Sequence, residues 1–385
     1  MITQWSRCLT MASAVLAAGC TSYGGGSASG EPAGPGYLPA GTPDISLSAG
    51  LTPDSVDYPV LFGTSRKPLP DGTGFSEDRD SSLHYGRIWI TVPKNHKRGS
   101  LGSELGTIFQ YDPKLTIARL EHVGDESQFL SLAARVLPPA TKPENGYVIV
   151  FIHGFNNSFE VAAIRAAQLG IDLGVPQNDM FLFSWAARSS IPRYTQDEAT
   201  VDASELFLRR FLETTAQAAG NRKIHLVAHS MGNRALMRVI AASVTGVARE
   251  RGLRFGQIIL AAADIDRDLF AQLAPNYLKV SDRTTVYLSP YDYAIGLSDI
   301  VHDYPRVGCG SSPQVVIPGI DSVVSTIPSD FPGHAYFAGS LPVLTDVKNL
   351  ILRNQPARQG KDWTKAGDYW IVGGPIDKTK LACPG

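Results

Sequence analysis

Ser230 stands where a short apolar run gives way to a helical pattern, with Ala228 two residues before it and Gly232 two residues after it. Small residues at these positions are typical of the sharp strand-to-helix turn that lifts a nucleophilic serine above the edge of a sheet. Glycine is usual at both positions, and this chain has alanine at the first. We expect Ser230 to be a catalytic nucleophile, and the alternative is an ordinary turn between a strand and a helix.

A serine needs a base to remove its proton, and the base is usually a histidine that a carboxylate orients. In folds that carry the nucleophile on such a turn, the serine comes first in the chain, the acid second and the histidine third. Of the eight histidines, only His302 and His334 follow Ser230. We expect His334 to be the base because it lies beyond the last predicted strand, whereas His302 lies in an earlier polar segment.

The acid has more than one candidate. Asp292 follows the predicted strand 285–288, one strand before the histidine segment, which is the usual place for the acid. Asp264 and Asp266 follow the preceding strand, 258–261. We expect Asp292 to orient His334, with Asp264 or Asp266 as the alternative, and the unused carboxylates to cap a helix or accept a loop hydrogen bond.

A second motif, Phe-Ile-His-Gly-Phe-Asn at 151–156, ends an apolar strand. Its glycine permits a sharp turn. We expect the backbone amides of Phe155 and Met231 to form an oxyanion hole.

His153 and His229 precede the acid in the chain, so we expect structural roles for both. His225 and His229 have the spacing of a zinc pair, but along a strand that spacing is roughly 13 Å, and we expect no metal or cofactor.

Apolar runs alternate with helical patterns along most of the chain, which predicts a mostly parallel, doubly wound α/β sheet with helices on both faces. Between the predicted strands 115–123 and 147–152, residues 126–137 have a helical or mixed pattern. The predicted strands are 59–66, 83–93, 115–123, 147–152, 180–183, 224–228, 258–261, 285–288 and 315–317, and the predicted helices are 161–173, 203–219 and 343–352.

The first residues resemble a bacterial lipoprotein signal, with Arg7, a short apolar core at 9–18 and small residues that end at Cys20. This pattern predicts a signal peptide at 1–20, lipidation of Cys20, and a location in the bacterial cell envelope on the periplasmic face. The segment 21–58 is rich in Gly, Ser and Pro and predicts a flexible tether, which leaves 59–385 as a single domain. Thr21 favours the outer membrane over the inner one.

Composition excludes two classes of protein. The chain has 385 residues, a formal net charge of −1 and a pI near 6.7, so it lacks the basic character of a nucleic-acid-binding domain. No apolar run reaches the length of about 18 residues that spans a membrane.

Two cysteines, Cys309 and Cys383, lie beyond the signal, and in an oxidising envelope we expect them to form a disulfide that ties the C-terminal tail to the domain.

At these motifs the chain resembles the alpha/beta-hydrolase superfamily, and more narrowly an uncharacterised bacterial branch of it, a domain of unknown function. The resemblance rests on the turn around Ser230, on the His-Gly-Phe motif, and on four further segments, which are 60–66, 183–185, 291–293 and 333–337. It implies the alpha/beta-hydrolase fold and serine chemistry, but no substrate.

We therefore expect a serine hydrolase that cleaves carboxylic esters of a small acyl substrate through an acyl-enzyme. The alternatives are an envelope lipase or acyltransferase, and a non-catalytic binding protein that kept the fold. Specificity is expected in the loops around Ser230, among them 186–203. There Arg188 or Arg193 meets an anionic group of the substrate, unless both are solvated arginines.

Overall fold

The computed structural model describes residues 37–38, 55–102, 114–137, 146–188, 193–244, 252–310, 315–329 and 333–383. The strands of these ranges form one sheet in the order β1-β4-β3-β2-β6-β5-β7-β8-β9-β10-β12-β11. Their bounds are β1 Tyr37–Leu38, β2 Ser55–Pro68, β3 Phe75–Pro93, β4 Thr116–Val123, β5 Tyr147–Ile152, β6 Met180–Ser184, β7 Lys223–His229, β8 Phe255–Ala261, β9 Ser281–Leu288, β10 Asp321–Ser325, β11 Trp363–Ala366 and β12 Tyr369–Val372.

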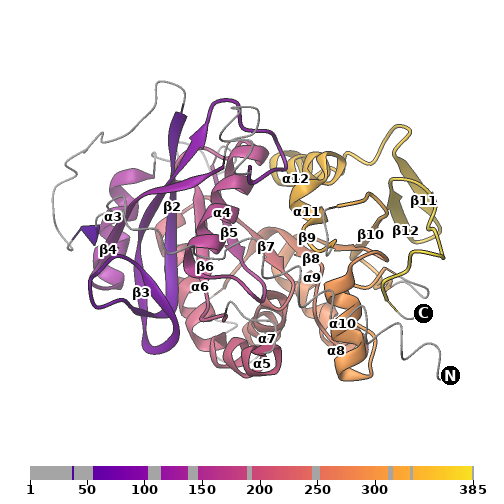
Figure 1. The fold of residues 1–385 in the computed structure, drawn as a ribbon, viewed down its shortest axis with the longest axis horizontal. Helices are drawn as coiled ribbons and strands as arrows, with labels where there is room; N and C mark the ends of the chain where they lie inside the picture. Colours follow the sequence, from indigo (N-terminus) through magenta and orange to yellow (C-terminus); the bar gives the residue numbers. More distant parts are fainter. Residues whose placement is uncertain are drawn as a thin grey trace, which may run out of the picture.

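The middle of the sheet is parallel, and antiparallel pairs lie toward its ends. Every neighbouring pair from β2 to β12 is parallel. Strand β3 pairs antiparallel with both β2 and β4 at one end, and β11 pairs antiparallel with β12 at the other (Figure 1). A mostly parallel sheet of this kind confirms the fold class expected from the alternation of strands and helices.

Helices cover both faces of the sheet. They are α3 Glu126–Val136, α4 Phe159–Leu173, α5 Tyr194–Ala203, α6 Glu205–Ala219, α7 Gly232–Ser243, α8 Arg267–Leu273, α9 Tyr277–Val280, α10 Tyr293–His302, α11 Tyr336–Gly339 and α12 Leu341–Arg353. One apolar core packs α3, α6 and α7 on the sheet, and a second packs α4, α11 and α12 on the other face. In Figure 1, α12 lies near the top and α5, α7 and α8 near the bottom.

Strand β5 shows why its sequence is apolar throughout. Val148, Val150 and Ile152 belong to the first core, whereas Ile149 and Phe151 belong to the second. Successive side chains of a strand point to opposite faces, so a strand with helices on both sides needs apolar residues at every position. None of the helices in the described ranges is long and apolar enough to cross a membrane.

Several expected bounds differ from the structure. Strand β2 begins at Ser55, and the buried hydroxyl of Tyr58 donates to the carbonyl oxygen of Val175 at 3.0 Å, so the expected tether ends before position 58. Residues 37–38, inside the expected tether, pair with β4. The signal segment and Cys20 lie outside the described residues.

Two further differences concern strands and loops. Residues 315–317 are not a strand, and the strand that pairs with β9 is β10, a few residues later. The segment expected as a loop at 186–203 contains helix α5. Its polar surface gives it almost no apolar stripe, which is why periodicity did not reveal it.

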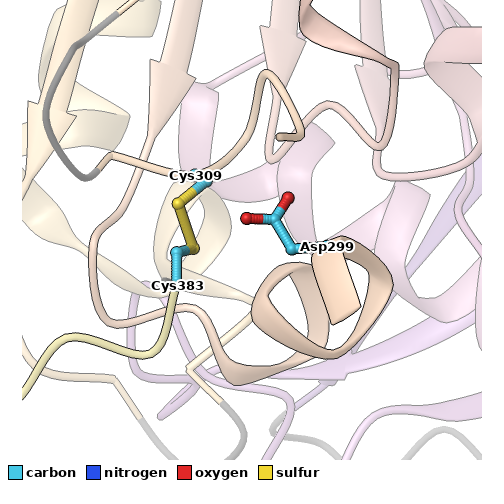
Figure 2. A group of neighbouring side chains, drawn as sticks. All are labelled: Asp299, Cys309 and Cys383. Atoms are coloured by element: carbon cyan, nitrogen blue, oxygen red, sulfur yellow. A yellow bond between two sulfur atoms is a disulfide. The ribbon is translucent and has the colours of Figure 1, made fainter. Parts of the chain in front are cut away.

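Cys309 and Cys383 are joined by a disulfide, with their Cα atoms 6.0 Å apart (Figure 2). The bond connects the segment after α10 with the end of the described chain. It therefore ties the C-terminal tail to the domain.

Candidate active site

The residues of interest gather at the carboxyl ends of neighbouring parallel strands. Ser230 follows β7 directly, and Asp292 follows β9 and begins α10. His334 lies between β10 and α11. Because β7, β8, β9 and β10 are adjacent and parallel, their carboxyl ends share one edge of the sheet, where ligands bind in open α/β folds.

Ser230 adopts a left-handed backbone conformation with a φ of 51°. This region is unfavourable for a residue with a Cβ atom, so the surrounding structure must hold it. The Ser230 amide donates to the carbonyl oxygen of Ala261 at 3.0 Å, and its own carbonyl oxygen accepts from the Asp264 amide at 3.3 Å. The Asn233 side chain donates to the same carbonyl oxygen at 3.0 Å.

Two glycines allow the turn to pack closely against the His-Gly-Phe loop. A Cβ atom on Gly154 would lie 2.7 Å from the Cβ of Ser230, and one on Gly232 would lie 2.4 Å from the carbonyl oxygen of His153. Both distances are too short for carbon contacts. The glycines at these positions therefore bring the loop and the serine turn into contact.

His334 pairs with Asp292. Its Nδ1 lies 2.8 Å from Oδ2 and 3.0 Å from Oδ1 of the fully buried Asp292 carboxylate. Nδ1–H donates to that carboxylate, which leaves Nε2 free to accept a proton. Burial lowers the pKa of His334, but the Asp292 charge and hydrogen bond outweigh burial and the net pKa is raised.

Asp292 also fixes the start of α10. Its Oδ1 accepts from the amides of Ala294 and Ile295, each at 3.1 Å, as an N-cap residue does. The carboxylate is thus held from two sides, by a helix end and by an imidazole. Its orientation toward His334 is set by the fold.

The alternative acids have other partners. The Asp264 carboxylate accepts from the hydroxyls of Tyr194 and Ser298 and lies 3.4 Å from Nε of Arg306. Asp266 caps α8 by accepting from the Leu269 amide at 2.8 Å. The structure therefore pairs His334 with Asp292 and with neither alternative.

His302 is also engaged away from the serine. Its Nε2 lies 2.7 Å from Glu198 Oε1, and its Nδ1 lies 2.8 Å from the carbonyl oxygen of Ser298. Both ring nitrogens thus have partners. Of the two histidines that follow Ser230 in the chain, His334 is the one that lines a cavity together with Ser230.

His153 has a structural environment. It is buried, and burial lowers its pKa to about 3. The ring stacks on Trp185 at 5.3 Å between centroids, and Nε2 lies 3.2 Å from the hydroxyl oxygen of Ser184. A neutral ring held in this way contributes packing beneath the loop.

Two backbone amides near Ser230 have no acceptor among the described residues, those of Phe155 and Met231. Phe155 is next to Gly154 and Met231 is next to Gly232, and at these two glycines the His-Gly-Phe loop and the serine turn pack closely together. Unpaired amides at a serine turn can stabilise an oxyanion, and the positive end of the α7 dipole lies next to Met231.

Ser230 and His334 line the same cavity, which measures about 850 Å³. Its other walls include Ser100, Leu101, Phe155, Arg165, Tyr194, His229, Asp264, Leu297, Val301 and Pro328. This volume falls in the range of pockets that bind small molecules.

The arginine in this wall is not one that we expected from the sequence. Arg165 lines the cavity, whereas neither Arg188 nor Arg193 does. Arg188 lies 3.7 Å from Asp78, and Arg193 is exposed. Arg165 lies within a helical pattern that we interpreted as packing, and only its position on a helix after the His-Gly-Phe motif could have indicated it.

One group of three side chains among the described residues is compact enough to share a metal ion, and it consists of Asp299, Cys309 and Cys383. Figure 2 shows the Asp299 carboxylate beside the disulfide. A thiolate is the form of cysteine that binds metals, and sulfurs joined to each other have none. The group is therefore structural in the disulfide form.

The comparisons with known proteins agree with this architecture. Residues 133–316 match a family described as alpha/beta hydrolase of unknown function (DUF900). A comparison with curated proteins found no match. The matched residues include the serine turn and Asp292, and the sheet around them has the expected order of parallel strands and helices. Over residues 133–316 the chain is thus similar to an alpha/beta-hydrolase family whose function is not established, and the sheet and helices around them have the alpha/beta-hydrolase fold.

Proposed function

We propose that this protein is a serine hydrolase that cleaves carboxylic esters through an acyl-enzyme, with Ser230, His334 and Asp292 as its triad. The observation that carries the proposal is the contact of 2.8 Å between His334 Nδ1 and Asp292, in the same cavity as a serine held in a left-handed turn. Similarity to an alpha/beta-hydrolase family over residues 133–316 supports it.

In the proposed reaction, Nε2 of His334 takes the proton of the Ser230 hydroxyl while the oxygen attacks the ester carbonyl carbon. Negative charge develops on the carbonyl oxygen, and the amides of Phe155 and Met231 donate to it. His334 then gives its proton to the departing alcohol. Water repeats the sequence on the acyl-enzyme, which releases the acid and restores the serine.

The cavity suits an ester with substituents of modest size. The cavity wall contains apolar side chains such as Leu297 and Val301 and polar groups such as Tyr194. A mixed wall of this kind binds the apolar part of a substrate and orients its polar part.

The first experiment is intact-mass measurement after treatment with a fluorophosphonate, on the mature chain without its N-terminal segment, followed by peptide mapping. A single adduct on Ser230 is expected, and none is expected on Ser230→Ala. His334→Ala should label far more slowly. A folded wild-type protein that stays unlabelled would contradict the proposal and favour a binding protein with this fold.

Product analysis with added alcohols addresses the acyltransferase alternative. An acyl-enzyme reacts with water or with an alcohol, and the product distinguishes the two outcomes. Release of free acid at the same rate with and without an acceptor would identify a hydrolase. Transfer to the alcohol would identify an acyltransferase.

We also propose that Cys20 is lipidated and holds the domain at the periplasmic face of an envelope membrane. The support is the apolar core at 9–18 followed by small residues and a cysteine. Membrane fractionation of the full chain should place it with the membranes, and Cys20→Ala should release it. Equal distribution of both proteins would contradict the anchor.

A further inference from the structure

Helix α4 presents an arginine to the active-site cavity. The helix begins directly after the His-Gly-Phe loop, where the Ser158 hydroxyl caps it by accepting from the Val161 amide at 3.2 Å. Arg165 lies farther along the same helix and lines the cavity together with Ser230. Since α4 packs in the second apolar core, this guanidinium is carried by a rigid element.

Arg165 has one hydrogen-bond partner among the described residues. Its Nη1 donates to Oε1 of Gln168 at 2.9 Å. A guanidinium has five N–H groups, so the remaining donors are left to the cavity and its contents. No carboxylate in the described part of the chain forms an ion pair with Arg165.

The carboxylate that acts electrostatically on Arg165, that of Asp172, already has other partners. The Asp172 carboxylate accepts from the side-chain amide of Gln168, from the amide of Gly99 at 2.7 Å, and lies 2.9 Å from Nε2 of His96. Burial lowers the pKa of Arg165 to about 10, and Asp172 opposes this effect only in part. The half-buried cation thus has no carboxylate paired with it among the described residues.

Two buried arginines, Arg66 and Arg358, have more partners in the protein than the half-buried Arg165 has. Arg66 donates to the Ser184 hydroxyl at 3.0 Å and to three backbone carbonyl oxygens. Arg358 pairs with Asp346 and Asp321, each at 2.9 Å. Compared with these two arginines, Arg165 has a single acceptor among the described residues, and its side chain lies in the active-site wall.

We propose that the substrate carries a carboxylate, separate from the ester group that reacts, and that Arg165 binds it. The proposal rests on the proposed function and names the substrate class of the same site. A planar guanidinium binds a carboxylate through two parallel hydrogen bonds, which would complete the donors that face the cavity.

A monoanion fits the charges of the wall better than a dianion. The fully charged side chains that line the cavity among the described residues are Arg165 and Asp264. The Asp264 carboxylate in the same wall disfavours a second negative charge on the substrate, whereas one guanidinium neutralises one carboxylate. A substrate that carries a carboxylate therefore fits this cavity better than one that carries a phosphate monoester.

The test uses matched pairs of esters, in which one member carries a carboxylate where the other has a neutral group. For the acyl side, the mono-para-nitrophenyl esters of adipate, pimelate and suberate are compared with neutral alkanoyl esters of the same chain lengths. For the alcohol side, para-acetoxybenzoate is compared with para-cresyl acetate. Wild type, Arg165→Met, Arg165→Lys and the control Arg193→Met are assayed, since Arg193 is exposed and outside the cavity wall.

We expect wild type to prefer the anionic member of at least one pair. Arg165→Met should lower this preference, as a ratio of kcat/KM values, by about 10- to 100-fold, the usual effect of losing hydrogen bonds to a charged group. Arg165→Lys should restore part of the ratio, and Arg193→Met should leave it unchanged. Equal losses for anionic and neutral esters in Arg165→Met would overturn the proposal, because they would indicate a role in the shape of the pocket alone.

Fluorophosphonate labelling and calorimetry distinguish this proposal from the proposed function. If Ser230 is labelled but no pair shows an Arg165-dependent preference, the substrate class is wrong and the hydrolase stands. If Ser230 is not labelled, titration of the mature protein with monomethyl adipate, which carries a single carboxylate, still decides the matter. Binding that weakens at least tenfold in Arg165→Met would support the carboxylate site, and equal or absent binding in both proteins would overturn it.

Discussion

Nε2 of His229 lies 3.1 Å from the backbone carbonyl oxygen of His334. Burial lowers the pKa of His229 well below its usual value, so the ring is neutral and can donate Nε2–H to that carbonyl. The ring also stacks on Phe337 with centroids 4.5 Å apart. The residue before the serine thus holds the loop that carries the proposed base, which explains a histidine at this position without a part in proton transfer.

Substitution His229→Phe should test this positioning role. Phenylalanine keeps the aromatic contact but cannot donate to the His334 carbonyl. We expect kcat to fall about 5- to 10-fold with KM nearly unchanged, because one neutral hydrogen bond is worth about 1 kcal/mol. Steady-state kinetics on a neutral ester measure both constants. A loss as large as that of Ser230→Ala would instead indicate a direct chemical role.

The two candidate acids can be separated with asparagine. Asp292→Asn keeps an N-cap for α10 but removes the charge beside His334, and kcat should fall by about 10⁴-fold. Asp264→Asn should cost far less activity, because Asp264 contacts Tyr194, Ser298 and Arg306 and not the base. The melting temperature of each variant serves as the control for folding. The reverse order of losses would make Asp264 the acid.

The pH profile should report His334. Its net pKa lies above the ordinary 6.5, and the base acts in its neutral form, so kcat/KM should rise with pH through a midpoint above that value. In Asp292→Asn the raising charge is gone and burial dominates, so the midpoint should move to lower pH. Profiles of both proteins on one neutral ester give the comparison. An unmoved midpoint would mean that another group titrates.

Substitution Gly154→Ala should disturb the serine turn. The added methyl group would lie 2.7 Å from Ser230 Cβ and 3.1 Å from the His229 carbonyl oxygen. We expect about 10²-fold lower kcat from the displaced nucleophile, and about 1–3 kcal/mol less stability toward unfolding. Gly374→Ala is the matched control, since a Cβ there meets nothing within 4 Å. Equal behaviour of the two variants would exclude a tight contact at Gly154.

Removal of the disulfide should lower stability. The bond closes a loop with a sequence separation of 74 residues, and chain entropy alone assigns about 4 kcal/mol to a loop of this size. The double variant Cys309→Ser with Cys383→Ser should unfold at a lower urea concentration than the oxidised wild type. Reductant should lower the wild-type midpoint and leave that of the double variant in place. Insensitivity of wild type to reductant would mean that the bond is not formed in solution.

The local patterns of the sequence predicted much of the fold. The apolar run before Ser230 and the small residues around it indicated β7 and the turn, because a sharp turn leaves room for few residue types. Chain order and position after the last predicted strand favoured His334, and position after strand 285–288 favoured Asp292 over Asp264 and Asp266. The structure brings the His334 and Asp292 side chains together. Their catalytic roles remain predictions that labelling and kinetics must test.

The parts that were missed depend on contacts between distant segments. Residues 76–82 of β3 are polar and partly or fully exposed, so they carry no apolar alternation, yet the buried Phe75 before them pairs with Pro68 to extend the hairpin with β2. Arg165 has nothing in its neighbourhood along the chain that indicates a cavity. Its position becomes meaningful only when α4, β7 and the loop of His334 are assembled, because the wall of the pocket comes from all three.

The disulfide has a consequence for where a working unit of this protein begins and ends. The family match stops at position 316, after Cys309 but before His334 and Cys383. A recombinant fragment cut to that match would hold the proposed nucleophile and the proposed acid, lack the proposed base, and leave Cys309 as an unpaired thiol. The smallest fragment that contains every strand from β2 onward, the proposed triad and both cysteines runs from Ser55 to Cys383.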